Sequence, residues 1–480
     1  MTSRRAFLAT GTGAAVLWAI RPAFGQSQDL ASLTLRRASD LIRTKAVSPV
    51  ELTQACLQRI EKYNPAFNAF ITVIRDQAIL AAREAETQIQ RGGWRGPLHG
   101  IPIALKDNID TAGIRTTGAS QLFENRIPDT DAEVAHRLKN AGAVLLGKLN
   151  LHEFAYGGSS NVTYFGTMHN PWAPEHVTGG SSGGAGIAVA SDFCYAALGT
   201  DTAGSVRMPA SHCGIVGLKP TYGLVSTRGV LVLSWTLDHV GPMCKTVEDA
   251  ALMMNVIAGF DELEPTSVDA PILDYTRAMK TSTSKLRLGI ARRPFFDNLN
   301  PEVAKAMDAA MAVLRKLTAT TEDVELPPVG NAATLWGSEA YAYHKQWITQ
   351  SPEKYQPGTR AQLQRTANAN GAEYAQARRD LDKVRRDIKK VFTKVDLLIA
   401  PTMKTPPALL SAPGGAGGGN NNVAFDMYGV PSISVPCGFT SAGLPIGLQI
   451  SGAHFGEMNV LALAHAYEQA TEWHKRKPKL

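Results

Sequence analysis

The feature that most constrains this chain of 480 residues is a pair of serines set in glycine-rich segments. The first segment reads Gly179-Gly180-Ser181-Ser182-Gly183-Gly184, and the second runs from Gly199 to Pro209 around Ser205. Glycine permits close backbone approach and positive φ, so these segments suit serines exposed in tight turns among free N–H groups. A glycine-rich run alone is usually an ordinary turn, and the pairing therefore has to be weighed with the rest of the chain.

A third block, Gly96–Asn108, lies upstream and reads as an apolar strand that ends in a single lysine. The residues Ile101 to Leu105 lead directly into Lys106. By position alone, a lysine at the end of a strand is usually a solvated edge charge. The pattern of residues that flanks Lys106, taken up next, reverses this expectation.

The three blocks together resemble the amidase signature family of serine hydrolases, as do Asn170-Pro171-Trp172 and Gly217–Thr221. The resemblance covers most of the chain. It implies that Lys106 is the catalytic lysine, that Ser181 follows a cis peptide bond and relays a proton, and that Ser205 is the nucleophile. It also implies hydrolysis of a small-molecule amide through an acyl-Ser205 intermediate, with no metal and no other cofactor.

The small residues around Ser205 keep backbone donors open for the carbonyl oxygen of a substrate. The N–H groups of Thr202, Ala203, Gly204 and Ser205 are the predicted oxyanion hole. Gly180, Ser182, Asp201 and Arg207 are expected to brace the two loops, with a solvated ion pair as the alternative for the last two. Tyr156, Gly157 and Ser159 are candidates for the substrate cleft, with a plain turn as the alternative.

A lysine serves as a base only when it is neutral. Its ordinary pKa is about 10.4, so a pKa near 7 requires a shift worth about 4 kcal/mol, which burial can supply. A histidine base is not expected: His212 reads as a packing residue, and Ala203 and Arg207 interrupt the Gly-x-Ser-x-Gly pattern around Ser205.

Helix and strand patterns alternate along the chain, which predicts an α/β fold with a mixed central sheet between helices. Helices are expected from Ser48 to the Asn64-Pro65 stop, over 72–91, from Thr130, from Thr246, from Asn300, within 330–395 and over 457–473. Strands are expected at 98–106, 143–146, 286–291, 395–401, 433–435 and 446–450.

Residues 26–480 are interpreted as one domain, in which the resemblance implies a variable helical region at 330–395 over the cleft. The aromatic residues there either contact substrate or join helices. The glycine- and asparagine-rich run 414–422 is expected to be a loop near the cleft, followed by Asp426, where the family often has asparagine.

Residues 1–25 have the pattern of an export signal, with Arg4-Arg5 before an apolar run of about 15 residues that ends at Gly25. The paired arginines indicate the twin-arginine type, so the precursor is expected to use that export machinery and the mature protein to be periplasmic or secreted. An uncleaved anchor is the alternative.

The chain has five cysteines, and we expect buried free thiols, with one disulfide as the alternative.

The net charge of +7 is spread among acidic residues and forms no basic stripe, so no nucleic-acid partner is expected. Two groups of alternatives to a carboxylic amide hydrolase remain open. A carbamate (urethane), anilide or ester hydrolase would use the same triad. An amidotransferase subunit or a non-catalytic homologue would be a different class; glutamine-dependent amidotransferases that amidate tRNA belong to this family. The export signal argues against the tRNA-amidating subunit, because that work is cytoplasmic.

Overall fold

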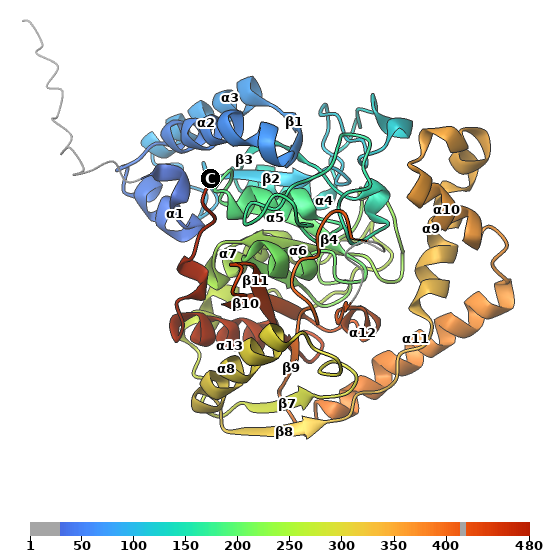
Figure 1. Ribbon diagram of the computed structural model, residues 1–480. Coiled ribbons are helices and arrows are strands. Elements are labelled where there is room, and N and C mark those ends of the chain that lie inside the picture. The colour runs from blue at the N-terminus through green and yellow to red at the C-terminus, as the bar shows by residue number, and fades with distance from the viewer. Residues whose placement is uncertain (1–28, 413–418) are drawn as a thin grey trace, which may run out of the picture.

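A computed structural model describes residues 29–412 and 419–480, and one mixed sheet of eleven strands runs through them (Figure 1). The strand order is β1-β3-β2-β4-β6-β5-β10-β11-β9-β7-β8. The strands are β1 (Phe70–Val73), β2 (Pro102–Lys106), β3 (Val144–Leu149), β4 (Ala196–Asp201), β5 (Val216–Lys219), β6 (His239–Cys244), β7 (Arg287–Ala291), β8 (Thr320–Val324), β9 (Leu397–Pro401), β10 (Ser432–Phe439) and β11 (Pro445–Gly452).

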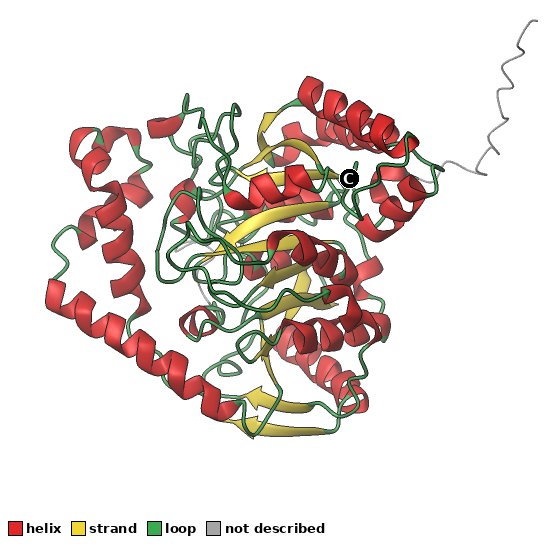
Figure 2. Cartoon of the chain, turned by 180° about the vertical axis from the view of Figure 1, so that it is seen from behind, coloured by secondary structure: helices red, strands yellow, loops and turns green. Residues whose placement is uncertain are grey.

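Helices flank this sheet on both sides, as Figures 1 and 2 show. The fold class expected from the sequence is therefore confirmed. The helices are α1 (Leu35–Arg43), α2 (Pro49–Phe67), α3 (Arg75–Gln90), α4 (Glu133–Asn140), α5 (Gly183–Ala190), α6 (Arg207–Cys213), α7 (Val247–Ile257), α8 (Pro301–Leu317), α9 (Ala332–Gln350), α10 (Pro357–Thr366), α11 (Gly371–Val391), α12 (Val423–Met427) and α13 (Glu457–Gln469).

The strand β2 lies between β3 and β4 and runs parallel to both. Parallel neighbours place their carboxyl ends at the same edge of a sheet, where the following loops gather. Lys106 ends β2 and Asp201 ends β4. The pairing of these strands therefore brings the predicted lysine beside the loop that carries Ser205.

The region 330–395 forms helices α9, α10 and α11, as expected from its composition. In Figures 1 and 2 these helices stand together at one side of the molecule, outside the layers that cover the sheet. The predicted pairing of the late strands is also confirmed, because β10 and β11 form an antiparallel pair.

Several boundaries differ from the expectations: the strand β2 begins at Pro102 and not at 98, and the helix α13 ends at Gln469 and not at 473. Three further differences concern other helices. The helix α2 has the capping box of Ser48 and Glu51, but it continues through Pro65 and ends at Asn68, whose φ of 55° is left-handed. A proline so near a helix end removes only one hydrogen bond of the last turn. Residues 70–73 pair with β3 as a strand, so the second helix begins at Arg75 and not at 72.

The third difference concerns α4, which begins at Glu133 with no side-chain cap at Ala132. Asp131 instead accepts a hydrogen bond from the N–H of Ala112 at 2.8 Å and pairs with Lys139.

All five cysteines are buried free thiols. Within 29–412 and 419–480, no helix combines the length and the apolar character that a bilayer crossing requires. The predicted export signal lies outside the described residues.

Candidate active site

Lys106 lies at the centre of the candidate site, and its side chain is 0% exposed. The strand β2 is buried along its whole length, so it carries the lysine into the interior. Its Nζ donates to the Oγ of Ser181 at 2.7 Å and to the Oγ1 of Thr200 at 2.7 Å. The Nδ2 of Asn108 donates to the same Thr200 hydroxyl at 3.2 Å. The lysine is thus held between one predicted partner and one that sequence reasoning missed.

Burial lowers the pKa of Lys106 to about 7, against the opposing effect of the carboxylates of Asp201 and Asp238. A large fraction of this amine is therefore neutral near pH 7, which a base requires. Asp238 is itself buried, and burial raises its pKa to about 6 despite the hydrogen bonds it accepts from Thr202, Ser234 and Leu233.

Ser181 is buried, and the peptide bond between Gly180 and Ser181 is cis, as the resemblance implied. The carbonyl oxygen of Ser181 accepts a hydrogen bond from the N–H of His152 at 3.1 Å. Gly180 is required by close approach, because a Cβ there would lie 2.6 Å from the Oγ of Ser160. The neighbouring Ser182 braces the loop as predicted, since its Oγ donates to the carbonyl oxygen of Thr200 at 3.2 Å.

Ser205 lies in the loop between β4 and α6 and is 7% exposed. The N–H of Ser182 donates to the carbonyl oxygen of Ser205 at 3.2 Å, so the two serine segments touch. Within the described residues, the hydroxyl of Ser205 makes no hydrogen bond to Ser181 or Lys106. The structure therefore brings all three predicted residues together but closes only the bond between Lys106 and Ser181.

A buried cluster of charges holds the Ser205 loop. Arg207 donates from Nη2 to Asp201 at 3.0 Å and to Asp426 at 2.6 Å, and all three side chains are buried. Burial alone would raise the pKa of Asp201, but the charge and hydrogen bonds of Arg207 hold it well below its usual range. Burial and the neighbouring Asp201 carboxylate raise the pKa of Asp426. The predicted bracing pair is thus not solvated, and Asp426 is its third member.

The predicted oxyanion donors require one correction. The N–H of Gly204 donates to the Oδ1 of Asp201 at 2.6 Å, so it is not available to a substrate in this structure. Within the described chain, the N–H groups of Thr202, Ala203 and Ser205 make no hydrogen bond. Sequence reasoning overestimated the set because it could not show where the Asp201 carboxylate points.

A cavity of about 180 Å³ opens over Ser205, and Tyr156 and Gly157 line it as predicted. Ser159 does not line it; this residue is buried, and its Oγ bonds Asn161 and His152. Residues from distant elements complete the lining, among them Trp336 of α9. Other aromatics of the helical region pack together, as in the contact of Tyr343 with Trp347.

Sequence reasoning missed four groups around Lys106. Thr200 stands inside the second glycine-rich segment, and Asn108 lies two positions after the lysine, so both were within reach of a motif reading. Asp238 and His152 had no such signal. Burial and the nearby Lys106 lower the pKa of His152 to about 3, which leaves this histidine neutral.

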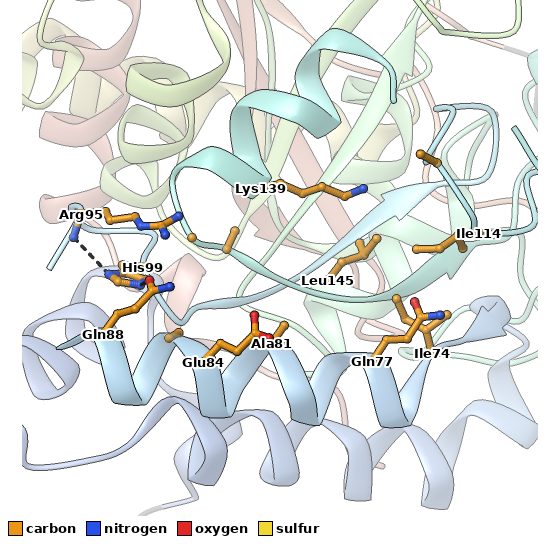
Figure 3. A pocket seen from close by; sticks show the side chains of 14 residues that line it. Ile74, Gln77, Ala81, Glu84, Gln88, Arg95, His99, Ile114, Lys139 and Leu145 are labelled. Atoms are coloured by element: carbon orange, nitrogen blue, oxygen red, sulfur yellow. Dashed lines mark hydrogen bonds between the residues drawn. The ribbon is translucent and has the colours of Figure 1, made fainter. Parts of the chain in front are cut away.

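Two other hollows lie outside this cavity, one separate from it and one next to it. One of about 310 Å³ lies between α3 and the segments of His99 and Lys139, and no predicted site residue lines it (Figure 3). Another of about 840 Å³ adjoins the Ser205 cavity, sharing Asn420 and Val423 with it. Among the described residues, no group of three or more His, Cys, Asp and Glu side chains is placed to hold a metal ion.

Comparisons with known proteins agree on one family. The family model described as Amidase matches residues 51–461. A curated relative, a glutamyl-tRNA(Gln) amidotransferase subunit from Geotalea daltonii, is 41% identical over 94% of this chain and 100% of that protein.

Two solved structures have the same fold over nearly their whole length. The native peptide amidase of Stenotrophomonas maltophilia superposes with a TM-score of 0.83, at 30% identity over 94% of this chain and 99% of that chain. A chain from a vestigial complex related to an s-triazine catabolic enzyme superposes with a TM-score of 0.88, at 29% identity over 93% of this chain and 100% of that chain.

Proposed function

Because this chain belongs to the amidase signature family and is an enzyme of that family, we propose that it cleaves the C–N bond of a carboxylic amide through an acyl-enzyme on Ser205. One observation carries the proposal: the buried Nζ of Lys106 lies 2.7 Å from the Oγ of Ser181, and the segment of Ser181 touches that of Ser205 at the floor of a cavity.

In the first half of the reaction, neutral Lys106 accepts the proton of Ser181 while Ser181 accepts that of Ser205. The Oγ of Ser205 then attacks the carbonyl carbon of the amide. The free N–H groups of Thr202, Ala203 and Ser205 are the donors for the oxygen that becomes negative. Each such donor contributes about 2.7–4 kcal/mol to the lowering of the barrier.

The C–N bond breaks as the lysine, through Ser181, returns a proton to the leaving amine. Water then attacks the carbonyl carbon of the acyl-Ser205 ester and gives its proton to the same relay. The bond between that carbon and the Oγ of Ser205 breaks, the relay returns the proton to Ser205, and the acid leaves. The missing bond between the two serine hydroxyls does not oppose this scheme, because catalytic hydrogen bonds often form only when substrate is bound.

A serine-directed fluorophosphonate tests the nucleophile. We expect mass spectrometry to find the label on Ser205 of the folded protein, no label in Ser205→Ala, and ammonia release from simple primary amides by the unmodified enzyme. Lys106→Ala should lose amide cleavage but retain part of its ester cleavage, since an alcohol leaves without full protonation. An unlabelled Ser205 in folded, wild-type protein would contradict the proposal.

A second candidate is the amide-cleaving component of an amidotransferase, and the 41% identity to such a protein over its full length gives this candidate the better support from sequence similarity. The acyl chemistry at Ser205 would be the same, with glutamine as the amide and ammonia passed to a partner. Carbamates, anilides and esters remain alternative substrates for the same residues. A panel of these bonds, together with glutamine, separates the candidates.

A further inference from the structure

The cavity over Ser205 has an uncharged lining. Within the described residues, no Asp, Glu, Lys, Arg or His side chain lines it. Two charged side chains lie behind the wall: Lys106 and Arg207 are 0% exposed and bonded to protein partners. Arg293 and Lys404 line the adjoining hollow and not this cavity.

Most of the polar side chains in the lining are already engaged. Thr202 donates its hydroxyl to Asp238, Asn420 donates from Nδ2 to the carbonyl oxygen of Ala203 at 2.8 Å, and Gln362 donates from Nε2 to that of Tyr156 at 3.2 Å. The polar groups left for a ligand are the backbone donors beside Ser205 and uncharged side-chain groups such as the hydroxyl of Tyr156 and the indole N–H of Trp336. The backbone donors fit the carbonyl oxygen of the amide, and none of these groups carries a charge that could pair with a charged group of the ligand.

Apolar side chains from separate elements form the remaining wall. Met208 comes from α6, Trp336 from α9 and Val423 from α12, and Leu233 comes from the loop before β6. The cavity of about 180 Å³ is also small beside the about 300–1,000 Å³ of sites for drug-sized ligands. It therefore suits one compact apolar group next to the reacting carbonyl.

We propose that the enzyme selects uncharged carboxylic amides with a small apolar acyl group, such as butanamide or benzamide, and discriminates against free glutamine. This inference rests on the proposed function. Glutamine carries an ammonium and a carboxylate near its side-chain amide, and a charge that enters an apolar cavity without a partner loses its hydration uncompensated. Arg365, whose charge acts on Tyr156, is exposed to solvent and outside the lining.

Four primary amides with the same leaving group, ammonia, test this inference. Butanamide has the glutamine side chain without either charge, glutaramic acid adds only a carboxylate, 4-aminobutanamide adds only an ammonium, and L-glutamine has both. We expect kcat/KM to be highest for butanamide and lower by on the order of 100-fold for glutamine. The kcat/KM for each singly charged amide should lie between the values for butanamide and glutamine.

A charge placed in the lining should change this order. Gln362→Arg is expected to raise kcat/KM for glutaramic acid relative to butanamide by on the order of tenfold, since it supplies a partner for the carboxylate. Gln364→Arg is the matched control, because Gln364 is exposed on the same helix and outside the lining. It should leave the ratio unchanged.

The outcomes separate the two proposals. Glutamine cleaved as well as butanamide, or better, would overturn the inference and leave the acyl-Ser205 mechanism intact, in favour of the amidotransferase candidate. An identical ratio in Gln362→Arg and Gln364→Arg would also count against the inference. Ammonia release from none of the four amides, with Ser205 unlabelled, would overturn the proposed function and the inference with it.

Discussion

At the scale of single residues, the protonation of Lys106 decides when the proposed relay works. The lysine accepts a proton only when it is neutral, and its pKa of about 7 places that change near neutral pH. Below the pKa the ammonium form dominates and cannot act as a base, whereas above it the amine is available.

We therefore expect kcat/KM for a neutral amide to rise about tenfold per pH unit up to about pH 7 and then to level off. A pH profile with butanamide or benzamide between about pH 5 and 9 measures this. A rate that is flat, or that falls, between about pH 6 and 8 would be inconsistent with lysine as the base.

Thr200 is, with Ser181, one of the two residues that bind the amine of this lysine. Its Oγ1 accepts from the Nζ of Lys106 at 2.7 Å, an interaction that favours the ammonium form. Thr200→Val should therefore shift the rising limb of the pH profile to lower pH by about one unit. It should also lower kcat more than it changes KM.

Thr200→Ser keeps the hydroxyl, so it should restore both the wild-type position of the rising limb of the pH profile and the wild-type kcat. If Thr200→Val keeps the wild-type pH profile and kcat, the threonine does not position the amine. If Thr200→Ser does not restore kcat and the pH profile, the lower kcat of Thr200→Val reflects altered packing and not the lost hydrogen bond.

At the scale of elements, the N-terminal end of α6 is held by a buried arginine between two carboxylates. Arg207 contacts Asp201 and Asp426, and the N–H groups of Gly204 and Val206 donate to Asp201 at 2.6 and 3.1 Å. This cluster sets the shape of the loop that presents Ser205. The same carboxylate that fixes the loop removes one N–H from the oxyanion hole.

The cluster should respond unequally to substitution. Arg207→Met leaves two buried carboxylates without their cation and should lower the free energy of unfolding by about 3–5 kcal/mol. Asp426→Asn should cost about 1 kcal/mol or less, because the raised pKa of Asp426 favours a neutral group there and an amide oxygen still accepts from Arg207. Urea denaturation measures both. Equal losses in the two variants would show that the arginine is not the member on which the cluster depends.

Helix α9 shows how an element combines both uses of its aromatic residues. Trp336 lines the Ser205 cavity, whereas Tyr343 and Trp347 pack against each other with ring centroids 5.6 Å apart. The sequence predicted the helices of 330–395 and left both uses open. Only the position of the helix relative to the loops over the sheet assigned a role to each ring.

At the scale of the whole molecule, residues 1–25 have the sequence pattern of an export signal. We propose that they form a twin-arginine export signal that is cleaved after Gly25. When the full chain is produced in a bacterium that has this machinery, the exported protein should begin at Gln26. The double variant Arg4→Lys, Arg5→Lys should stay in the cytoplasm.

N-terminal sequencing of the exported protein and fractionation of the cells measure these outcomes. An exported form that begins at Met1 or Thr2 would contradict cleavage. Export also bears on the class of enzyme, because an amidotransferase that acts on a tRNA would have no such substrate outside the cytoplasm.

The sequence alone predicted the family, the α/β fold, most elements and the residues Lys106, Ser181 and Ser205. The fold and the elements follow from local patterns of glycine, apolar residues and caps, which depend on neighbours in the chain. The family and the roles of the three residues came from the resemblance of the motifs around them to the amidase signature family. Only the tertiary structure assigned Thr200 and Asp238 to the lysine, withdrew Gly204 from the oxyanion donors and Ser159 from the cleft, and showed that the cavity has an uncharged lining. These facts depend on which loops the strand order brings together and on where carboxylates find their partners, and both arise from contacts between residues far apart in the chain.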